Sequence, residues 1–256
     1  MNKKPLLALL FIGALSSAAA AQDSAEVLWA DLAGTRALSS VQETSGQAGG
    51  QVSEEWYSPK LRGSLSVYAR ASFPSSTEVT VDGLWYSDFF EWGAGVSIEG
   101  DLLTFVTPHW GVGGYVSVNW DRFYGETLHF FNGDVLNVGD MDMETVIIGA
   151  KVLQRVSPFV YWEGRLGVGW VHYERTTWSG VDAGTPFADE ELFKSIDRFV
   201  FELGGRIAAG SRHVQVDFGF GMRWMGGAAR GADVSSFIDP DVLITFMLEL
   251  GLTVRF

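Results

Sequence analysis

The final stretch of the chain, residues 241–256, alternates between two kinds of side chain. In DVLITFMLELGLTVRF every second residue from Val242 to Phe256 is apolar, and the intervening positions include Asp241, Glu249 and Arg255. A period of two places successive side chains on opposite faces of an extended backbone. We therefore predict a long β-strand here. A tilted strand that crosses a membrane needs about 9 to 11 residues, so the length of this stretch fits a barrel wall.

The same alternation recurs about eight times and predicts an antiparallel up-and-down arrangement. The further stretches are 61–72, 92–102, 112–121, 143–155, 160–170, 198–207 and 213–224. The links between them alternate in length: residues 74–91, 124–142, 175–196 and 226–240 are long, whereas the links around 107–109, 156–158 and 210–212 are tight. Long extracellular loops and short periplasmic turns are typical of a transmembrane β-barrel.

The start of the chain predicts export. Lys3 and Lys4 precede a short apolar run that ends in small residues, with Ala19 and Ala21 placed for cleavage. This pattern indicates a signal peptide over residues 1–21, with an uncleaved anchor as the alternative. Residues 22–60 are rich in Ser, Gly and Gln, which predicts a flexible periplasmic tail, or alternatively a small plug or lid. The barrel is expected over residues 61–256.

Composition narrows the range of functions. The chain has 18 Lys+Arg against 31 Asp+Glu, a net charge of −13, so nucleic acid is not expected as a partner. It has no Cys, which excludes disulfides and thiol chemistry. No motif points to a cofactor, and none is predicted.

The polar face of the predicted strands decides which side faces inward. A soluble, lipocalin-like barrel would show the same period with its faces reversed. Here Gly is interspersed with large charged residues, as expected where small residues make room inside a narrow lumen. The predicted charge network of a filled lumen consists of Arg62, Arg70, Glu99, Asp101, Asp121, Lys151, Glu163, Arg165, Glu202, Arg206, Asp217, Arg223, Glu249 and Arg255. On the apolar face, Trp92, Trp120, Trp170 and Trp224 fall near the loop-side strand ends and suggest an aromatic girdle.

Residues 61–256 resemble the small bacterial outer-membrane barrels, OmpA-like or OmpW-like, in pattern and layout. The resemblance extends to a closing strand whose residues act in that family as a signal to the assembly machinery. Here these would be Leu248, Leu250, Gly251, Leu252, Val254 and Phe256. It implies an outer-membrane location, contact with membrane lipid and lipopolysaccharide, and the barrel assembly machinery as a partner during biogenesis. We expect a monomer.

The histidines are the first candidates for chemistry. A lipid A deacylase-like enzyme would need a His beside a Ser and an acid on the outer wall. Of His109, His129, His172 and His213, His172 is the best placed, two positions after Trp170. Only Ser179 and Glu174 lie near it in sequence, and no complete set of partners is evident. His109 and His213 are interpreted as turn residues, and no enzyme is predicted.

Asp140, Asp142 and Glu144 are weak candidates for a metal site. An extended backbone would place the three carboxylates on one face, where Ca²⁺ or Mg²⁺ could bridge to lipopolysaccharide phosphates. A solvated acidic loop base is favoured, because no ligand loop of defined spacing accompanies them. The acidic run at Asp189, Glu190 and Glu191 is treated in the same way.

The favoured function is a structural or surface-interaction role through long extracellular loops, since binding sites on such scaffolds lie in loops. A narrow channel or transporter for small, apolar molecules is the first alternative. A membrane-embedded lipid A-modifying hydrolase is the second.

Overall fold

The computed structural model describes residues 61–75, 79, 84–130, 133–182, 184–211, 213–232 and 242–256. The predicted signal peptide (1–21) and tail (22–60) lie outside these residues. Among the described residues, no helix is both long enough and apolar enough to cross a membrane.

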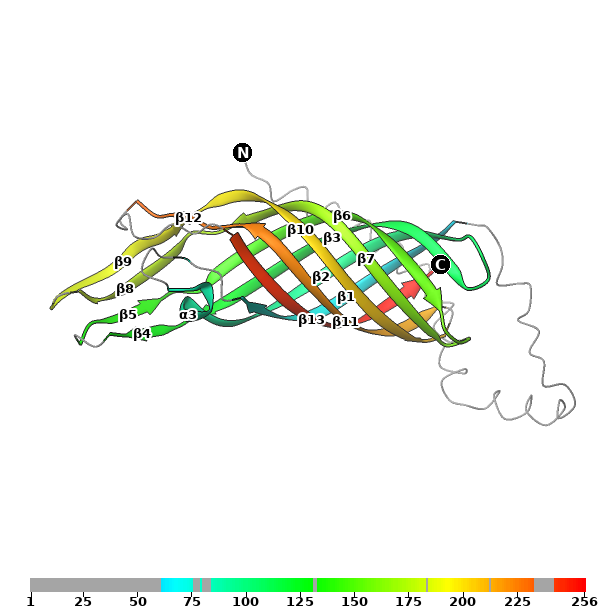
Figure 1. Ribbon diagram of the computed structural model, residues 1–256, viewed down its shortest axis with the longest axis horizontal. Helices are drawn as coiled ribbons and strands as arrows, with labels where there is room; N and C mark the ends of the chain where they lie inside the picture. The colour runs from blue at the N-terminus through cyan, green and yellow to red at the C-terminus, as the bar shows by residue number, and fades with distance from the viewer. Residues whose placement is uncertain are drawn as a thin grey trace, which may run out of the picture. The chain divides into compact units, whose positions relative to one another are not determined.

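Eight antiparallel strands close into a barrel, which confirms the predicted fold (Figure 1). Around the barrel the order is β1-β13-β11-β10-β7-β6-β3-β2, so consecutive long strands are neighbours. The strands are β1 (Arg62–Pro74), β2 (Phe90–Phe105), β3 (Trp110–Gly125), β6 (Met141–Arg155), β7 (Val160–Tyr173), β10 (Ile196–Gly210), β11 (Val214–Gly226) and β13 (Val242–Arg255). All eight predicted alternating stretches form these strands.

The first and last strands close the barrel. In the pairing of β1 with β13, Tyr68 lies opposite Gly251 and Arg70 opposite Glu249. At the end of this seam the Gly63 N–H donates to the Phe256 carbonyl at 3.2 Å, and the Phe256 N–H donates to the Gly63 carbonyl at 3.0 Å. Closure leaves no unpaired sheet edge, which a membrane-spanning sheet requires.

The three tight turns share one hydrogen-bonding pattern. In each, a hydroxyl oxygen accepts hydrogen bonds from the backbone N–H groups two and three residues ahead, and so replaces the strand pairing that ends there. Thr107 Oγ1 accepts from residues 109 and 110, Ser157 Oγ from 159 and 160, and Ser211 Oγ from 213 and 214. His109 and His213 lie in two of these turns, as interpreted from the sequence.

The connections at the opposite end form a second sheet that sequence analysis did not predict. Five short strands are arranged in the order β12-β9-β8-β5-β4 beyond the strand ends of the barrel (Figure 1). They are β4 (Thr127–His129), β5 (Val135–Val138), β8 (Thr176–Asp182), β9 (Thr185–Lys194) and β12 (Ala229–Arg230). A one-turn helix, α3 (Tyr86–Phe89), precedes β2.

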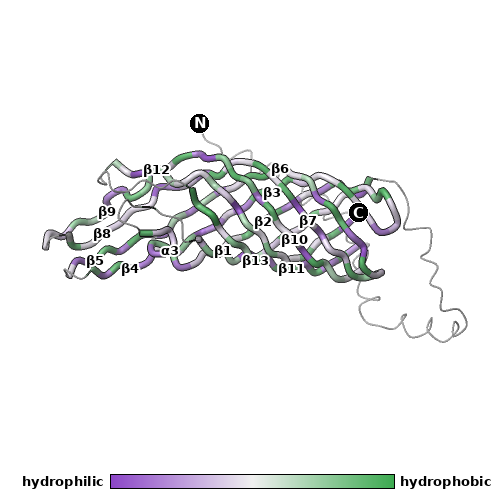
Figure 2. Tube along the Cα trace, in the orientation of Figure 1, coloured by the Kyte–Doolittle hydropathy of each residue, from purple (hydrophilic) through white to green (hydrophobic). Residues whose placement is uncertain are grey.

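The barrel is apolar outside and polar inside, as predicted. Hydrophobic and hydrophilic residues alternate along its strands (Figure 2). The apolar Phe218, Phe220 and Leu250 are 54%, 58% and 58% exposed, whereas Glu202 and Arg206 are 1% and 2% exposed. An apolar belt that continues around every barrel strand suits hydrocarbon, because soluble proteins rarely expose contiguous apolar patches of more than a few hundred Å².

Candidate functional site

The middle of the barrel interior holds one continuous network of ion pairs. Five cations and six carboxylates are joined by thirteen pairs at 2.6–3.4 Å. Its members are Arg70, Glu99, Asp101, Asp121, Lys151, Glu163, Arg165, Glu202, Arg206, Arg223 and Glu249, which come from all eight barrel strands. The inward face of the alternating pattern places these predicted residues together.

Arg206 lies at the centre of the network. Its Nη1 is 2.8 Å from Glu99 Oε1, and its Nε donates to Glu249 Oε2 at 3.0 Å. The guanidinium carbon also lies 3.8 Å from the centroid of the Tyr68 ring, and the Tyr68 hydroxyl accepts a hydrogen bond from Nη1 at 2.9 Å. A buried cation is tolerated when carboxylates and an aromatic face replace its water in this way.

Small residues make room for the large ones, as the sequence predicted. A Cβ added at Gly219 would lie 2.7 Å from Arg206 Cγ, and one at Gly251 would overlap the Tyr68 ring. Gly149 and Gly167 face the Tyr115 ring in the same way. The interior is therefore packed with side chains, as expected of a barrel of about eight strands.

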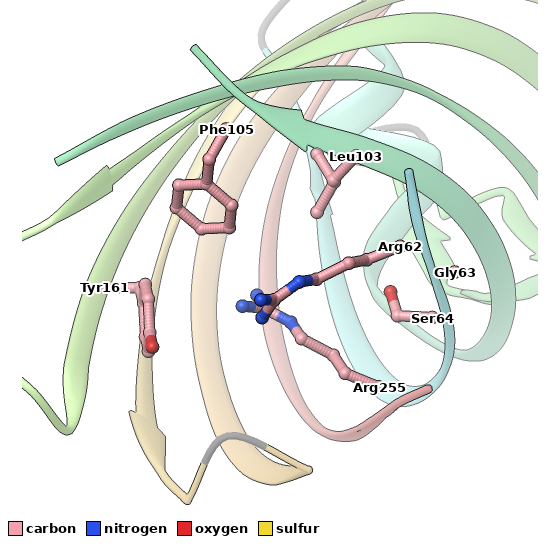
Figure 3. A pocket seen from close by; sticks show the side chains of 7 residues that line it. All are labelled: Arg62, Gly63, Ser64, Leu103, Phe105, Tyr161 and Arg255. Atoms are coloured by element: carbon pink, nitrogen blue, oxygen red, sulfur yellow. The ribbon is translucent and has the colours of Figure 1, made fainter. Parts of the chain in front are cut away.

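Three of the predicted network residues belong to other environments. Asp217 makes no ion pair with a described residue; its Oδ2 accepts hydrogen bonds from the hydroxyls of Thr253 and, at 3.3 Å, Tyr68. Arg62 and Arg255 lie at the turn end of the lumen (Figure 3). Asp217 is nevertheless joined to the network through Tyr68, whose hydroxyl also accepts a hydrogen bond from Arg206. Arg62 and Arg255 form none of the ion pairs of the network described above.

At the turn end of the lumen, Arg62 and Arg255 point toward each other beside Phe105 and Tyr161 (Figure 3). The Arg62 guanidinium carbon is 5.8 Å from the Phe105 ring centroid, and that of Arg255 is 5.0 Å from the Tyr161 ring centroid. Within the described ranges no carboxylate lies within ion-pair distance of either. The cavity they line has a volume of only about 10 Å³, roughly enough for one water.

The other end of the lumen is closed by an apolar cluster, which sequence analysis missed. Tyr86 and Phe89 of α3 are 0% and 1% exposed, and both lie against Phe193 of β9, with ring centroids 6.3 and 6.5 Å apart. The Tyr86 hydroxyl accepts a hydrogen bond from the Ala228 N–H at 3.0 Å. Inward residues of the barrel strands, among them Phe123, complete the cluster. The high density of aromatic residues in LWYSDFF, residues 84–90, could have indicated this apolar cluster from the sequence.

A second arrangement of interest lies on the outer surface, at the end of the barrel that carries the second sheet. His172 Nδ1 is 2.8 Å from Asp197 Oδ1, and His172 Nε2 is 3.2 Å from Ser195 Oγ. Ser179 and Glu174, the residues close to His172 in sequence, are placed elsewhere: Ser179 lies on β8 opposite Asn137, and the Glu174 side chain is exposed. The partners of His172 are instead Asp197 on β10 and Ser195 just before it, 25 and 23 residues along the chain.

The candidate metal carboxylates are engaged differently. Asp142 forms a two-contact ion pair with Arg122, at 2.6 and 2.7 Å. Asp140 Oδ1 accepts a hydrogen bond from the Gly125 N–H at 3.2 Å, and Glu144 lies opposite His172 in the pairing of β6 with β7. In the part of the chain that is described, no group of three or more His, Asp or Glu side chains is arranged to hold a metal ion.

Two predicted surface features are on the outward face. Trp92 and Trp170 are 39% and 64% exposed, and Trp120 and Trp224 are partly exposed. The proposed assembly residues of β13 also point outward, with Leu248, Leu250, Leu252 and Val254 between 46% and 58% exposed and Phe256 77% exposed. Gly251 faces inward against Tyr68.

No known protein family and no curated protein sequence matches the chain. Among solved structures, it is similar to Ail, the attachment invasion locus protein of Yersinia pestis, crystallised with the heparin analogue sucrose octasulfate: 16% identity over 77% of this chain and 99% of that chain, TM-score 0.43. The outer membrane enzyme PagL shows 11% identity over 73% and 97%, TM-score 0.42. The outer membrane protein OprG from Pseudomonas aeruginosa shows 9% identity over 78% and 98%, TM-score 0.41. Each of these three proteins is similar to this chain in structure, at low sequence identity.

Proposed function

We propose that this chain is an integral outer-membrane barrel that acts as a structural or surface-interaction protein. The observation that supports this best is the combination of an apolar exterior with a lumen filled by ion pairs. Such a barrel would bury its outer wall in hydrocarbon while its charges satisfy one another inside. Outer-membrane lipid and lipopolysaccharide would be its surroundings, and the assembly machinery its partner during insertion. This role needs no catalytic group.

The surface offered to the outside would be the five-stranded sheet. It joins strands from three of the four long connections, and Trp178, Leu192 and Phe193 anchor it in the apolar cluster. Its acidic side chains include Asp189, Glu190 and Glu191 of β9. Complementary charge guides association between surfaces, so a partner surface with positive charge suits this sheet.

The location can be tested with the two described lysines. Lys151 is 2% exposed within the lumen, whereas Lys194 is exposed at the end of β9. A membrane-impermeant amine reagent added to intact cells should label Lys194, and a Lys194→Arg variant should lose that label. The protein should also fractionate with the outer membrane and shift on a gel after boiling, as a folded barrel does. A soluble protein that shows no heat shift would contradict the proposal.

A narrow transporter is the weaker alternative. A route along the axis would have to cross the apolar cluster, the ion-pair network and the Arg62–Arg255 end in turn. The side chains of the first two layers are almost all buried, and in the third the half-buried Arg62 and Arg255 lie beside the buried Phe105 and Tyr161. The filled interior therefore favours the structural role.

A further inference from the structure

Three side chains with the chemistry of a nucleophilic hydrolase meet on the outer wall. His172 points outward, because Val171 and Tyr173 on either side of it are both 0% exposed and face inward. Asp197 lies directly opposite it on β10, and Ser195, the residue immediately before β10, places its hydroxyl beside the same imidazole. The pairing of β7 with β10 thus gives the histidine an acid on one ring nitrogen and a serine on the other.

The hydrogen bonds follow the order that acyl transfer requires. Asp197 Oδ1 is 2.8 Å from Nδ1 of His172, so it can hold the tautomer with a proton on that nitrogen. Nε2 is then free to accept a proton, and Ser195 Oγ lies 3.2 Å from it. A nucleophile–base contact of about 2.6–3.2 Å, with the base oriented by a third group, is the signature of an activated serine.

The position of these residues points to the class of substrate. Directly below His172 and Asp197, the paired Trp170 and Phe199 are 64% and 58% exposed and begin the apolar belt. Aromatic residues of this kind mark the boundary between hydrocarbon and water. The site therefore lies one pleat above that boundary, on the water side. The ester bonds that join acyl chains to lipid headgroups occupy the same depth.

We propose that Ser195, His172 and Asp197 form a hydrolase site that cleaves acyl esters of membrane lipids at the outer rim of the barrel. This choice of substrate rests on the proposed membrane location. Ser195 Oγ attacks the ester carbonyl carbon while His172 Nε2 takes its proton. The carbon–oxygen bond to the lipid alcohol then breaks, and the alcohol leaves with that proton. Water, deprotonated by His172, releases the acyl group from Ser195 as a fatty acid.

The surrounding groups are consistent with this assignment. Both Asp197 and His172 are open to an approaching lipid, with side chains 73% and 39% exposed. Glu144 lies opposite His172 on β6, on the side away from Asp197. Beyond it, Arg122 and Asp142 form an ion pair on the same wall. Asp197 is the positioning residue of the set, since it acts through His172.

The test uses the full mature chain, refolded in detergent and checked for folding by its heat shift. Fatty acid release is measured by mass spectrometry from mixed micelles of a diacyl phospholipid and, separately, from lipopolysaccharide. A fluorophosphonate, which modifies activated serines, is applied to the same preparations. We expect release from at least one lipid and covalent labelling at Ser195. Ser195→Ala and His172→Ala should each reduce release by about 100-fold or more, and Asp197→Asn should reduce the turnover rate while lipid binding is retained.

Ser179→Ala is the matched control, because Ser179 lies on β8 in the neighbouring sheet. This variant should release fatty acid at the same rate as the unaltered chain. The proposal is overturned if the folded protein releases no fatty acid and is not labelled, or if release persists in Ser195→Ala. Cleavage of a water-soluble short-chain ester, without cleavage of either lipid, would also overturn it. A folded, membrane-located protein that fails these assays leaves the structural role intact, so the two proposals fail separately.

Discussion

Arg206 on β10 and Glu99 on β2 form an ion pair across the barrel interior, with Nη1 2.8 Å from Oε1 and both residues at most 2% exposed. These strands are not neighbours in the barrel. The pair therefore links parts of the wall that backbone hydrogen bonds do not join. Eight of the thirteen ion pairs of the network likewise join strands that are not neighbours, and they link the cylinder from within.

Replacement of Arg206 by Met should destabilise the barrel strongly. The substitution leaves Glu99, Glu163 and Glu249 without one of their cations. Removal of one partner from a buried pair costs about 3–5 kcal/mol, because the remaining charge stays buried. Denaturant unfolding in detergent measures the free energy of unfolding. Arg122→Met is the control: its ion pair with Asp142 is exposed to solvent, so its loss should lower the free energy of unfolding far less. Equal losses in the two variants would contradict the role assigned to the network.

An alanine at Gly149 should weaken the barrel, because its Cβ would overlap the Tyr115 ring and the Leu166 carbonyl oxygen. Overpacking of this kind costs about 1–3 kcal/mol. At Gly100 nothing lies within 4 Å of the added Cβ, so Gly100→Ala serves as the matched control. Thermal or denaturant unfolding of both variants measures the difference. If Gly149→Ala is as stable as Gly100→Ala, the claim that side chains pack tightly around Gly149 in the lumen is contradicted.

Purified protein should form no stable ion channel in planar lipid bilayers. The lumen is closed by the apolar cluster at one end, by the ion pairs at its centre and by Arg62 with Arg255 at the other end. Current traces should show no steps above the leak of the bare membrane at moderate voltage. Reproducible single-channel steps would favour the transporter alternative.

Replacement of Ser157 by Ala should cost a smaller amount, on the order of 1 kcal/mol, because its hydroxyl oxygen accepts from the N–H groups of Phe159 and Val160. The exposed turn allows water to replace part of this loss. The free energy of unfolding should fall in Ser157→Ala, whereas Ser157→Thr should retain most of it. A loss as large as that of Arg206→Met would mean that the turn stabilises more than its own hydrogen bonds.

Period-two alternation predicted the barrel strands and which residues share a face. The glycines and charges of the polar face then predicted that residues such as Arg206 and Glu99 point inward. The sequence pattern did not predict which of these inward charges form ion pairs with one another. Which charges meet depends on the stagger between strands, and so the sequence could not show that Asp217 reaches Arg206 through Tyr68 or that Arg62 and Arg255 lie together beside Phe105.

The outer-rim site illustrates the same limit. His172 was identified as the candidate histidine from its place after Trp170, but its partners could not be found among its sequence neighbours. Asp197 reaches it through the register of β7 with β10, and Ser195 through its place immediately before β10. The second sheet was missed for a related reason: strands such as Thr127–His129 are too short for alternation to distinguish them from loop.

The orientation of the wall is the central claim, and single cysteines test it most directly because the chain contains none. Phe218→Cys places a thiol on the outward face, and Ser117→Cys places one inside, where Ser117 is 2% exposed. In lipid vesicles, Phe218→Cys should react with a membrane-soluble maleimide and resist a water-soluble one, whereas Ser117→Cys should resist both until the barrel is unfolded. Reaction of the cysteine at 218 with the water-soluble reagent, or its protection from both reagents, would contradict the membrane-facing exterior.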